Sequence, residues 1–202
     1  MGEPARDPAS AEFFDAKYEA DRDPWRFADD PYELGRYRTI VHHVDPLMHR
    51  RVYEPGCSVG VLTEMLGGRC EHVDATDLSG AAVALARQRC AHLPGVSVGV
   101  GDLSHPPGPP GASYDLIVLS EVGYYQPLPV LEQNIATLSA RIRWGGRLIA
   151  AHWIGTSPDH RLSGNEVHDL IGRSLHGWAH PVHEVHRHPV RDGFRLDVWD
   201  RP

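Results

Sequence analysis

The chain has 202 residues, of which 41% are hydrophobic and 23% charged, and this fits one globular domain with a sizeable core. The formal net charge of -7 and the lack of a long basic run argue against nucleic acid as a partner, because phosphate binding rests on Lys and Arg. Three cysteines form neither an even set nor a CxxC pair, and the longest aliphatic run, Leu116–Leu119, is too short to cross a bilayer. We therefore expect a cytoplasmic protein with reduced thiols and no membrane contact.

The N-terminal quarter of the chain predicts a tail followed by helices. Residues 13–32 read as a short, aromatic-rich helix broken at Pro24, because proline biases the preceding residue away from the helical region. A second helix is predicted over about residues 32–49. We expect residues 1–10 to be a flexible tail. Residues 11–202 should form a single domain, with a helical cap over 11–50 and a core over 51–202.

Beyond residue 50, strand-like and helix-like patterns alternate, which is typical of a parallel sheet with crossover helices on both faces. The last two strands flank the turn residues "RDG" and predict an antiparallel hairpin at the sheet edge. The predicted fold is therefore α/β, a Rossmann-like, doubly wound sheet of seven strands. The strands are expected at 51–56, 70–79, 96–103, 113–122, 145–153, 181–190 and 194–200, with helices at 60–66, 81–91, 129–142 and 165–176.

The residues that end the first predicted strand indicate a ligand-binding turn. Glu54, Gly56 and Gly60 form the pattern ExGxxxG, in which glycine lets a ligand approach the backbone closely. A dinucleotide fingerprint would need glycines where Ser58 and Val61 stand. NAD is therefore the second choice of ligand.

The ends of the next two strands favour a nucleoside. Asp77 lies 21 residues beyond Gly56, a distance at which an acidic side chain can accept hydrogen bonds from ribose hydroxyls. Asp102 can accept a hydrogen bond from an exocyclic amino group, while Leu103 covers a purine face. Together the three strand ends would enclose an adenosine.

The stretches "VYEPGCSVG", "ATDLS", "GDL" and "YDLIVLSEV", in this order and spacing, resemble the class I methyltransferases that use S-adenosylmethionine. The resemblance covers roughly residues 52–153. Within that superfamily, "YEADRDPWRFADDPYE", "LSEVGYY" and "GFRLDVW" resemble the nodulation protein S group, whose namesake N-methylates an amino sugar of a chitin oligosaccharide.

This resemblance implies S-adenosylmethionine as cofactor and S-adenosylhomocysteine as its product. Glu54, Gly56 and Gly60 would form the turn on the methionine side, and Ser58 departs from the glycine that many members carry there. Asp77 would bind the ribose, and Asp102 with Leu103 the adenine. The expected cofactor contacts further include Leu78 and Ser120, Trp25 as part of a lid, and Arg38 as partner of the cofactor carboxylate.

Residues beyond the fourth and fifth strands are the natural suppliers of acceptor chemistry. Methyl transfer to an amine needs an aligned lone pair and a group that takes or positions the proton. We predict His152 or Glu121 as the base or amine-orienting group, with Tyr124 positioning the acceptor.

Several of these residues also have purely structural interpretations. Asp77 can cap the helix that starts near Ser79, Asp102 can be an ordinary turn carboxylate, and Trp25 can be core packing. Eight of the 14 histidines fall between His152 and His188, but side chains of a regular strand alternate between faces and no cysteine accompanies them. No metal site is therefore predicted.

The function that we predict is methyl transfer from S-adenosylmethionine to a small molecule, most simply the amine of a sugar or related metabolite. Two alternatives stay open: an O-methyltransferase acting on a hydroxyl, and a protein that binds S-adenosylmethionine without catalysis. The expected partners are a small-molecule acceptor and, at most, a second copy of the chain, since a monomer and a homodimer fit the sequence equally.

Overall fold

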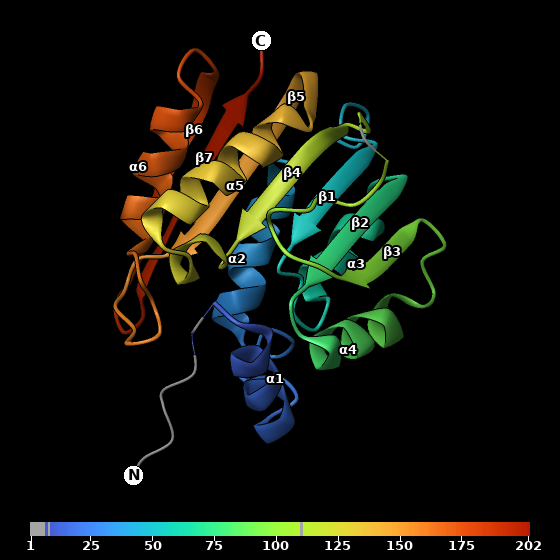
Figure 1. The fold of residues 1–202 in the computed structure, drawn as a ribbon, viewed down its shortest axis with the longest axis vertical. Coiled ribbons are helices and arrows are strands. Elements are labelled where there is room, and N and C mark those ends of the chain that lie inside the picture. The colour runs from blue at the N-terminus through green and yellow to red at the C-terminus, as the bar shows by residue number, and fades with distance from the viewer. Residues whose placement is uncertain (1–6, 8, 110) are drawn as a thin grey trace.

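A seven-stranded sheet forms the centre of the protein (Figure 1). The structure, a computed structural model, describes residues 7, 9–109 and 111–202. The strand order is β3-β2-β1-β4-β5-β7-β6; the first five strands in this row are parallel, and β7 runs antiparallel to both of its neighbours. The winding reverses between β1 and β4, which confirms the doubly wound prediction. The strands are β1 (Arg51–Pro55), β2 (His72–Asp77), β3 (Val96–Val100), β4 (Tyr114–Ser120), β5 (Ile142–Trp153), β6 (Ala179–His188) and β7 (Asp192–Asp200).

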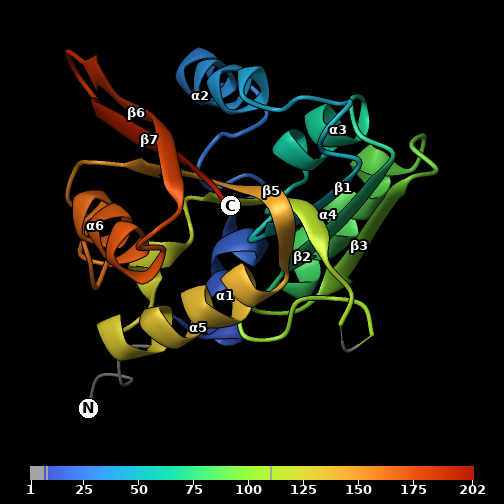
Figure 2. The ribbon, with the colours of Figure 1, turned by 90° about the horizontal axis from the view of Figure 1, so that it is seen from above.

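Helices cover both faces of the sheet, as Figure 2 shows from above. On one face lie α2 and α3, with α4 beside α3, and on the other lie α5 and α6. In Figure 1, α1 lies beyond the carboxyl ends of the parallel strands, where the ligand is expected. The helices are α1 (Ala11–Ala20), α2 (Pro31–His42), α3 (Val61–Gly67), α4 (Gly80–Cys90), α5 (Leu128–Ala140) and α6 (Gly164–Ser174), with a short 3₁₀ helix, η1 (Gly123–Tyr125).

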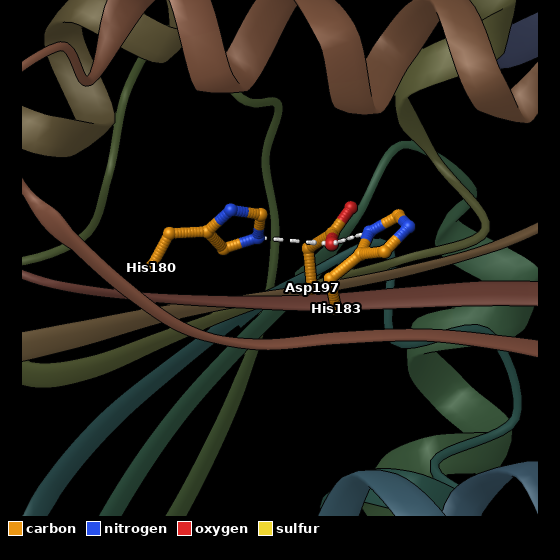
Figure 3. Close-up of side chains that lie close together, drawn as sticks. All are labelled: His180, His183 and Asp197. Atoms are coloured by element: carbon orange, nitrogen blue, oxygen red, sulfur yellow. Dashed lines mark hydrogen bonds and ion pairs between the residues drawn. The ribbon is translucent and has the colours of Figure 1, made fainter.

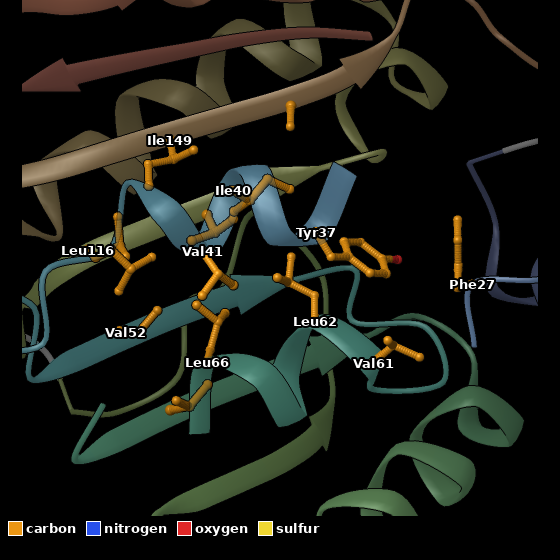
Figure 4. Close-up of a cluster of buried hydrophobic side chains, with 14 of the residues drawn as sticks. Phe27, Tyr37, Ile40, Val41, Val52, Val61, Leu62, Leu66, Leu116 and Ile149 are labelled. Carbon is orange, nitrogen blue, oxygen red and sulfur yellow. The ribbon is translucent and has the colours of Figure 1, made fainter. Parts of the chain in front are cut away.

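Strand β4 is buried on both faces because helices cover both sides of it. Leu116 and Val118 pack into the core beneath α2 and α3, which Figure 4 shows from the side. Ile117 and Leu119, which alternate with them, belong to the core beneath α5 and α6. The central strand therefore joins two apolar layers and holds its own carboxyl end, at Ser120, in a fixed place.

The N-terminal helices are shorter than the sequence predicts. Helix α1 ends at Ala20, four positions ahead of Pro24. Helix α2 begins at Pro31, close to its predicted start, and Asp30 accepts a hydrogen bond from the Tyr32 amide (2.9 Å). Proline is favoured in the first turn, so Asp30 and Pro31 together start the helix. Its end at His42, not His49, fits the proline at position 46, which disfavours helical backbone before it. Of the predicted tail, residues 1–6 and 8 lie outside the described part of the chain.

The predicted antiparallel hairpin is present, with β6 at the sheet edge and β7 between β6 and β5. The pairing of β6 with β7 shifts register between Ala179 and Val182. Such an irregularity changes which side chains share a face. Within the described ranges, no helix is long and apolar enough to span a bilayer.

Candidate active site

A cavity opens at the carboxyl ends of β1, β2, β3 and β4, and encloses about 790 Å³ when its mouth is included. Most of the predicted site residues meet in its wall, although they come from elements far apart in the sequence. Those that line it are Trp25, Glu54, Gly56, Asp77, Leu78, Asp102, Leu103, Ser120, Glu121 and Tyr124.

The turn after β1 is held in left-handed backbone. Gly56 and Gly60 have φ angles of 74° and 80°. A side chain on Gly56 would overlap Val122 after β4, and one on Gly60 would meet Ala86 of α4. Gly56 therefore lines the cavity and keeps it open, whereas Gly60 lets α3 and α4 pack closely and lies outside the cavity wall.

Ser58 stands in the same turn at a φ of 49°, a conformation that favours glycine. Two contacts hold it there: its amide donates to Asp77 Oδ2 (2.8 Å), and its hydroxyl lies 2.5 Å from the Tyr18 hydroxyl. The serine at the middle position of the turn thus keeps the backbone shape expected of a glycine and gains a link to α1.

Asp77 lies at the end of β2, and Ser79 rather than Asp77 caps helix α4. Its Oδ1 accepts from the Ser79 amide (2.9 Å), and Ser79 in turn caps α4 by accepting from the Ala82 amide (3.2 Å). A carboxylate has about four acceptor positions, so two backbone donors leave it able to accept further hydrogen bonds. Asp77 lines the cavity, where ribose hydroxyls would meet it.

Glu54 is buried at the end of β1, with a side-chain hydrogen bond from Thr63 to Oε2 (2.7 Å). Burial raises the pKa of Glu54 to about 8, and the nearby Asp77 charge adds to the rise, while the Thr63 hydrogen bond opposes it. At neutral pH the carboxyl is therefore mostly protonated in the free protein. An ammonium group placed beside it would favour its ionised form.

Asp102 and Leu103 extend the wall past β3. Four hydrogen bonds end on Asp102 Oδ1, from the amide and hydroxyl of Ser104 (2.8 and 2.5 Å) and from the amide and ring Nδ1 of His105 (3.1 and 3.2 Å). Partial burial opposes ionisation, but these bonds lower the pKa of Asp102 below its usual range. Asp102 is thus an ionised turn residue that also lines the cavity, and Leu103 is buried beside it.

Glu121 follows β4 in left-handed backbone, at a φ of 60°. Tyr124 donates its hydroxyl proton to Oε2 (2.6 Å), and the Trp153 amide donates to Oε1 (2.7 Å). Burial, followed by the Glu121 charge, raises the pKa of Tyr124 well above its usual value, so the phenol stays protonated. The pair presents an oriented carboxylate and a hydroxyl to the cavity.

Arg36, rather than Arg38, is the arginine behind this wall. Arg36 is fully buried; it donates to the Ser120 hydroxyl (2.6 Å) and to Glu33 (2.5 Å), and lies 3.6 Å from Glu121 Oε1. Arg38 is exposed and lies outside the cavity wall. The prediction that Arg38 pairs with a cofactor carboxylate is therefore wrong in geometry, because Arg38 is on the solvent side of α2.

His152 lies beneath the cavity and is fully buried, so it does not contact an acceptor as predicted. Its Nε2 accepts from the Gly123 amide (3.2 Å), so its Nδ1 carries the proton and donates to His168 Nε2 (3.1 Å). His168 Nδ1 then donates to Asp197 Oδ2 (2.6 Å). Burial lowers the pKa of His152 well below its usual value, so this imidazole stays neutral. The row of hydrogen bonds through His152 holds η1 in place.

Aromatic side chains from the N-terminal segment cover the cavity, and only Trp25 was predicted to do so. Phe14, Tyr18, Trp25 and Phe27 line it, and Trp25 stacks on Phe27 with ring centres 5.8 Å apart. Phe14 meets Tyr125 edge to face at 5.0 Å. The sequence signal for this lid is the density of aromatic residues between positions 13 and 27.

Polar contacts tie α1 to both sides of the cavity. Ser79 donates its hydroxyl proton to Asp15 at 2.5 Å, on the side of β2, and Lys17 pairs with Asp159 at 3.0 Å, on the side of β5. With the link from Tyr18 to Ser58, these contacts close the lid over the strand ends.

The fold is that of class I methyltransferases. The structure superposes with a TM-score of 0.82 on the N-methyltransferase NodS of Bradyrhizobium japonicum WM9, crystallised with S-adenosyl-L-homocysteine, at 20% identity over 98% of this chain and 100% of that one. A putative methyltransferase of Pseudomonas syringae gives 0.70, at 30% identity over 84% of this chain and 99% of that one.

The Nodulation protein S (NodS) family model matches residues 10–151, and the chain belongs to this family. Nodulation protein S of Bradyrhizobium diazoefficiens is 31% identical over 112 residues, which are 51% of this chain and 49% of that protein. The chain thus matches about half the length of its curated relatives.

The raised pKa of Glu54 predicts a stability difference that depends on pH. Above the ordinary pKa of glutamate the unfolded chain ionises Glu54 freely, whereas the folded chain resists until about pH 8. Relative to Glu54→Gln, the wild type should lose roughly 2–4 kcal/mol of unfolding free energy between pH 5 and pH 9. Denaturant titrations at several pH values measure this loss. Glu132→Gln, on the exposed side of α5, is the matched control and should show no such trend.

Proposed function

We propose that the protein transfers the methyl group of S-adenosylmethionine to the amine of a small molecule, an amino sugar or a related metabolite. One observation carries the proposal. The carboxyl groups expected to bind the cofactor, on Glu54, Asp77 and Asp102, line the same cavity as Glu121 and Tyr124.

The cavity residues fit S-adenosylmethionine part by part. Gly56 lines the part of the cavity where the methionine portion would lie, and Glu54 offers a carboxyl to its ammonium group. Asp77 retains acceptor capacity for the ribose hydroxyls, while Asp102 and Leu103 suit the adenine. Aromatic rings of the lid, such as Trp25 and Phe27, stabilise a cationic sulfonium through their π faces.

Bound S-adenosylmethionine supplies an electrophilic methyl group, and the chain's own residues orient the acceptor and exclude water. The Glu121 carboxylate attracts a protonated amine and receives its proton, which frees the nitrogen lone pair. Tyr124 fixes one Glu121 oxygen, and the Trp153 amide fixes the other, so the carboxylate cannot rotate away. The aromatic lid lowers the local dielectric around these charges.

The relatives support an amine as acceptor. The structure with the TM-score of 0.82 is that of an N-methyltransferase, and the family is named for Nodulation protein S. A carboxylate rather than an imidazole at the acceptor side fits a cationic amine better than a neutral hydroxyl. We therefore place the reaction at nitrogen.

An assay with methyl-labelled S-adenosylmethionine tests the proposal directly. Glucosamine and chitin oligosaccharides bearing one free amine serve as acceptors, and their N-acetylated counterparts, which keep only hydroxyl groups, serve as controls. Label should enter only the amines, and S-adenosylhomocysteine should form as the second product. Transfer to the N-acetylated sugars would indicate an O-methyltransferase, and binding of the cofactor without transfer to any acceptor would indicate a catalytically silent protein.

Removing the carboxylate at the end of β2 should weaken cofactor binding. Asp77→Ala leaves ribose hydroxyls without their acceptor, so the affinity for S-adenosylhomocysteine should fall by about 1–3 kcal/mol, roughly 5- to 150-fold. Calorimetry measures this affinity, with Asp74→Ala, three residues earlier in the same strand and outside the cavity wall, as control. Equal affinity of wild type and Asp77→Ala, or tight binding of NAD by the wild type, contradicts the site.

Loss of the Tyr124 hydroxyl should slow transfer but leave cofactor affinity unchanged. Tyr124→Phe frees Glu121 Oε2 to rotate, and we expect kcat to fall about 10- to 100-fold, less than the roughly 100- to 10,000-fold that an acid-base group itself contributes, because Tyr124 only positions one. Glu121→Gln should cost more because the charge is lost. The control is Tyr32→Phe, whose buried hydroxyl has no hydrogen-bond partner among the described residues. Full turnover by Tyr124→Phe removes the residue from the mechanism.

A further inference from the structure

Away from the cavity, two histidines and an aspartate gather on the edge hairpin (Figure 3). His180 and His183 belong to β6 and Asp197 to β7. We propose that these three residues form a binding site for a divalent transition-metal ion, with Zn²⁺ as the simplest occupant.

The strand pairing explains how the three side chains meet. His183 stands directly opposite Asp197 in the ladder, so both point to one face of the hairpin. His180, three positions earlier, would point to the other face of a regular strand, but the register shift between Ala179 and Val182 turns it to the same side. The alternation expected along this strand therefore does not hold here.

The ligand atoms are already aimed at one point. Asp197 Oδ1 lies 2.9 Å from His180 Nε2 and 2.6 Å from His183 Nδ1. The His180 ring is fixed by stacking on Trp199, with centres 4.9 Å apart and planes within 7°. The other oxygen, Oδ2, accepts from Arg195 Nε (2.7 Å) and from His168 (2.6 Å), which fixes the carboxylate and leaves Oδ1 to the two outer histidines.

The donor set suits a transition metal. Imidazole nitrogens favour Zn²⁺, Cu²⁺ and Ni²⁺, whereas Ca²⁺ and Mg²⁺ prefer oxygen ligands throughout. The three ligand atoms lie within 4.8 Å of one another. Ligands of a tetrahedral zinc ion lie about 3.3 Å apart. To admit the metal, each histidine nitrogen would move a few tenths of an ångström away from Oδ1, and the two nitrogens would move closer to one another.

The position also supplies access and a fourth ligand. The side chains of His180 and His183 are 37% and 53% exposed, so an ion reaches them from solvent and water completes its coordination. Arg195 is the nearby positive charge that opposes a cation, and Asp169 pairs with it at 2.8 Å. These charges favour a readily exchanged ion over a permanently held one.

The same carboxylate links the proposed metal site to the active site. Asp197 Oδ2 begins the buried chain through His168 and His152 to the Gly123 amide. A cation on Oδ1 would withdraw charge from Oδ2 and so act on the support of η1. The metal site is nevertheless distinct from the cavity, because none of its three ligands lines the cavity.

The test uses the full chain without a histidine tag, stripped of metal and titrated with Zn²⁺ by calorimetry and with Co²⁺ by visible absorption. We expect one ion per chain and, for Co²⁺, d–d bands of low-symmetry coordination. His183→Gln and His180→Gln should each weaken binding at least tenfold. His186→Gln is the matched control: it removes another exposed imidazole of β6, which pairs with Glu184, and should leave binding unchanged.

Two outcomes would overturn the proposal: no ion bound by the wild type, or equal binding by the wild type and the His180→Gln, His183→Gln double variant. Binding of S-adenosylhomocysteine, measured on the same samples, shows that each variant is folded. It also separates this proposal from the proposed function, because zinc can bind whether or not methyl transfer occurs.

Discussion

The burial of carboxylates at the carboxyl end of the sheet is the constraint on which the rest of this molecule depends. A buried charge is costly unless it is paired, hydrogen-bonded or neutralised, and each carboxyl here meets that demand differently. Glu54 holds its proton, Asp77 accepts from backbone amides, Glu121 accepts from a phenol and an amide, and Asp197, within β7, is bound by three histidines and an arginine. The turns, caps and lid contacts that shape the cavity are largely the donors that these groups require.

The fold and the cofactor side were predictable because they depend on local patterns. Alternating strands and helices define the doubly wound sheet, and a glycine or carboxylate just after a parallel strand can only lie at one edge of it. Gly56, Asp77 and Asp102 met in one wall for that reason. The family match over residues 10–151 includes these strand ends.

The acceptor side was less predictable because it depends on tertiary contacts. Position in the chain did not reveal that His152 at the end of β5 faces inward to His168, since the two meet only after α6 packs on the sheet. The helix period could have chosen Arg36 over Arg38: Arg36 shares a face with Ile40, four positions on, and both are buried. Spacing within a helix was thus a better guide than the identity of one basic residue.

The attachment of α1 to both sides of the cavity bears on how the protein would work through successive cycles. Asp15 and Tyr18 contact the turns after β2 and β1, while Lys17 and Phe14 contact the segment after β5 and η1. Because this ten-residue helix is attached on both sides of the cavity, it cannot expose the cofactor side while it covers the acceptor side. Departure of S-adenosylhomocysteine and of the methylated product would then depend on the same motion of α1, so the slower of the two departures would limit both.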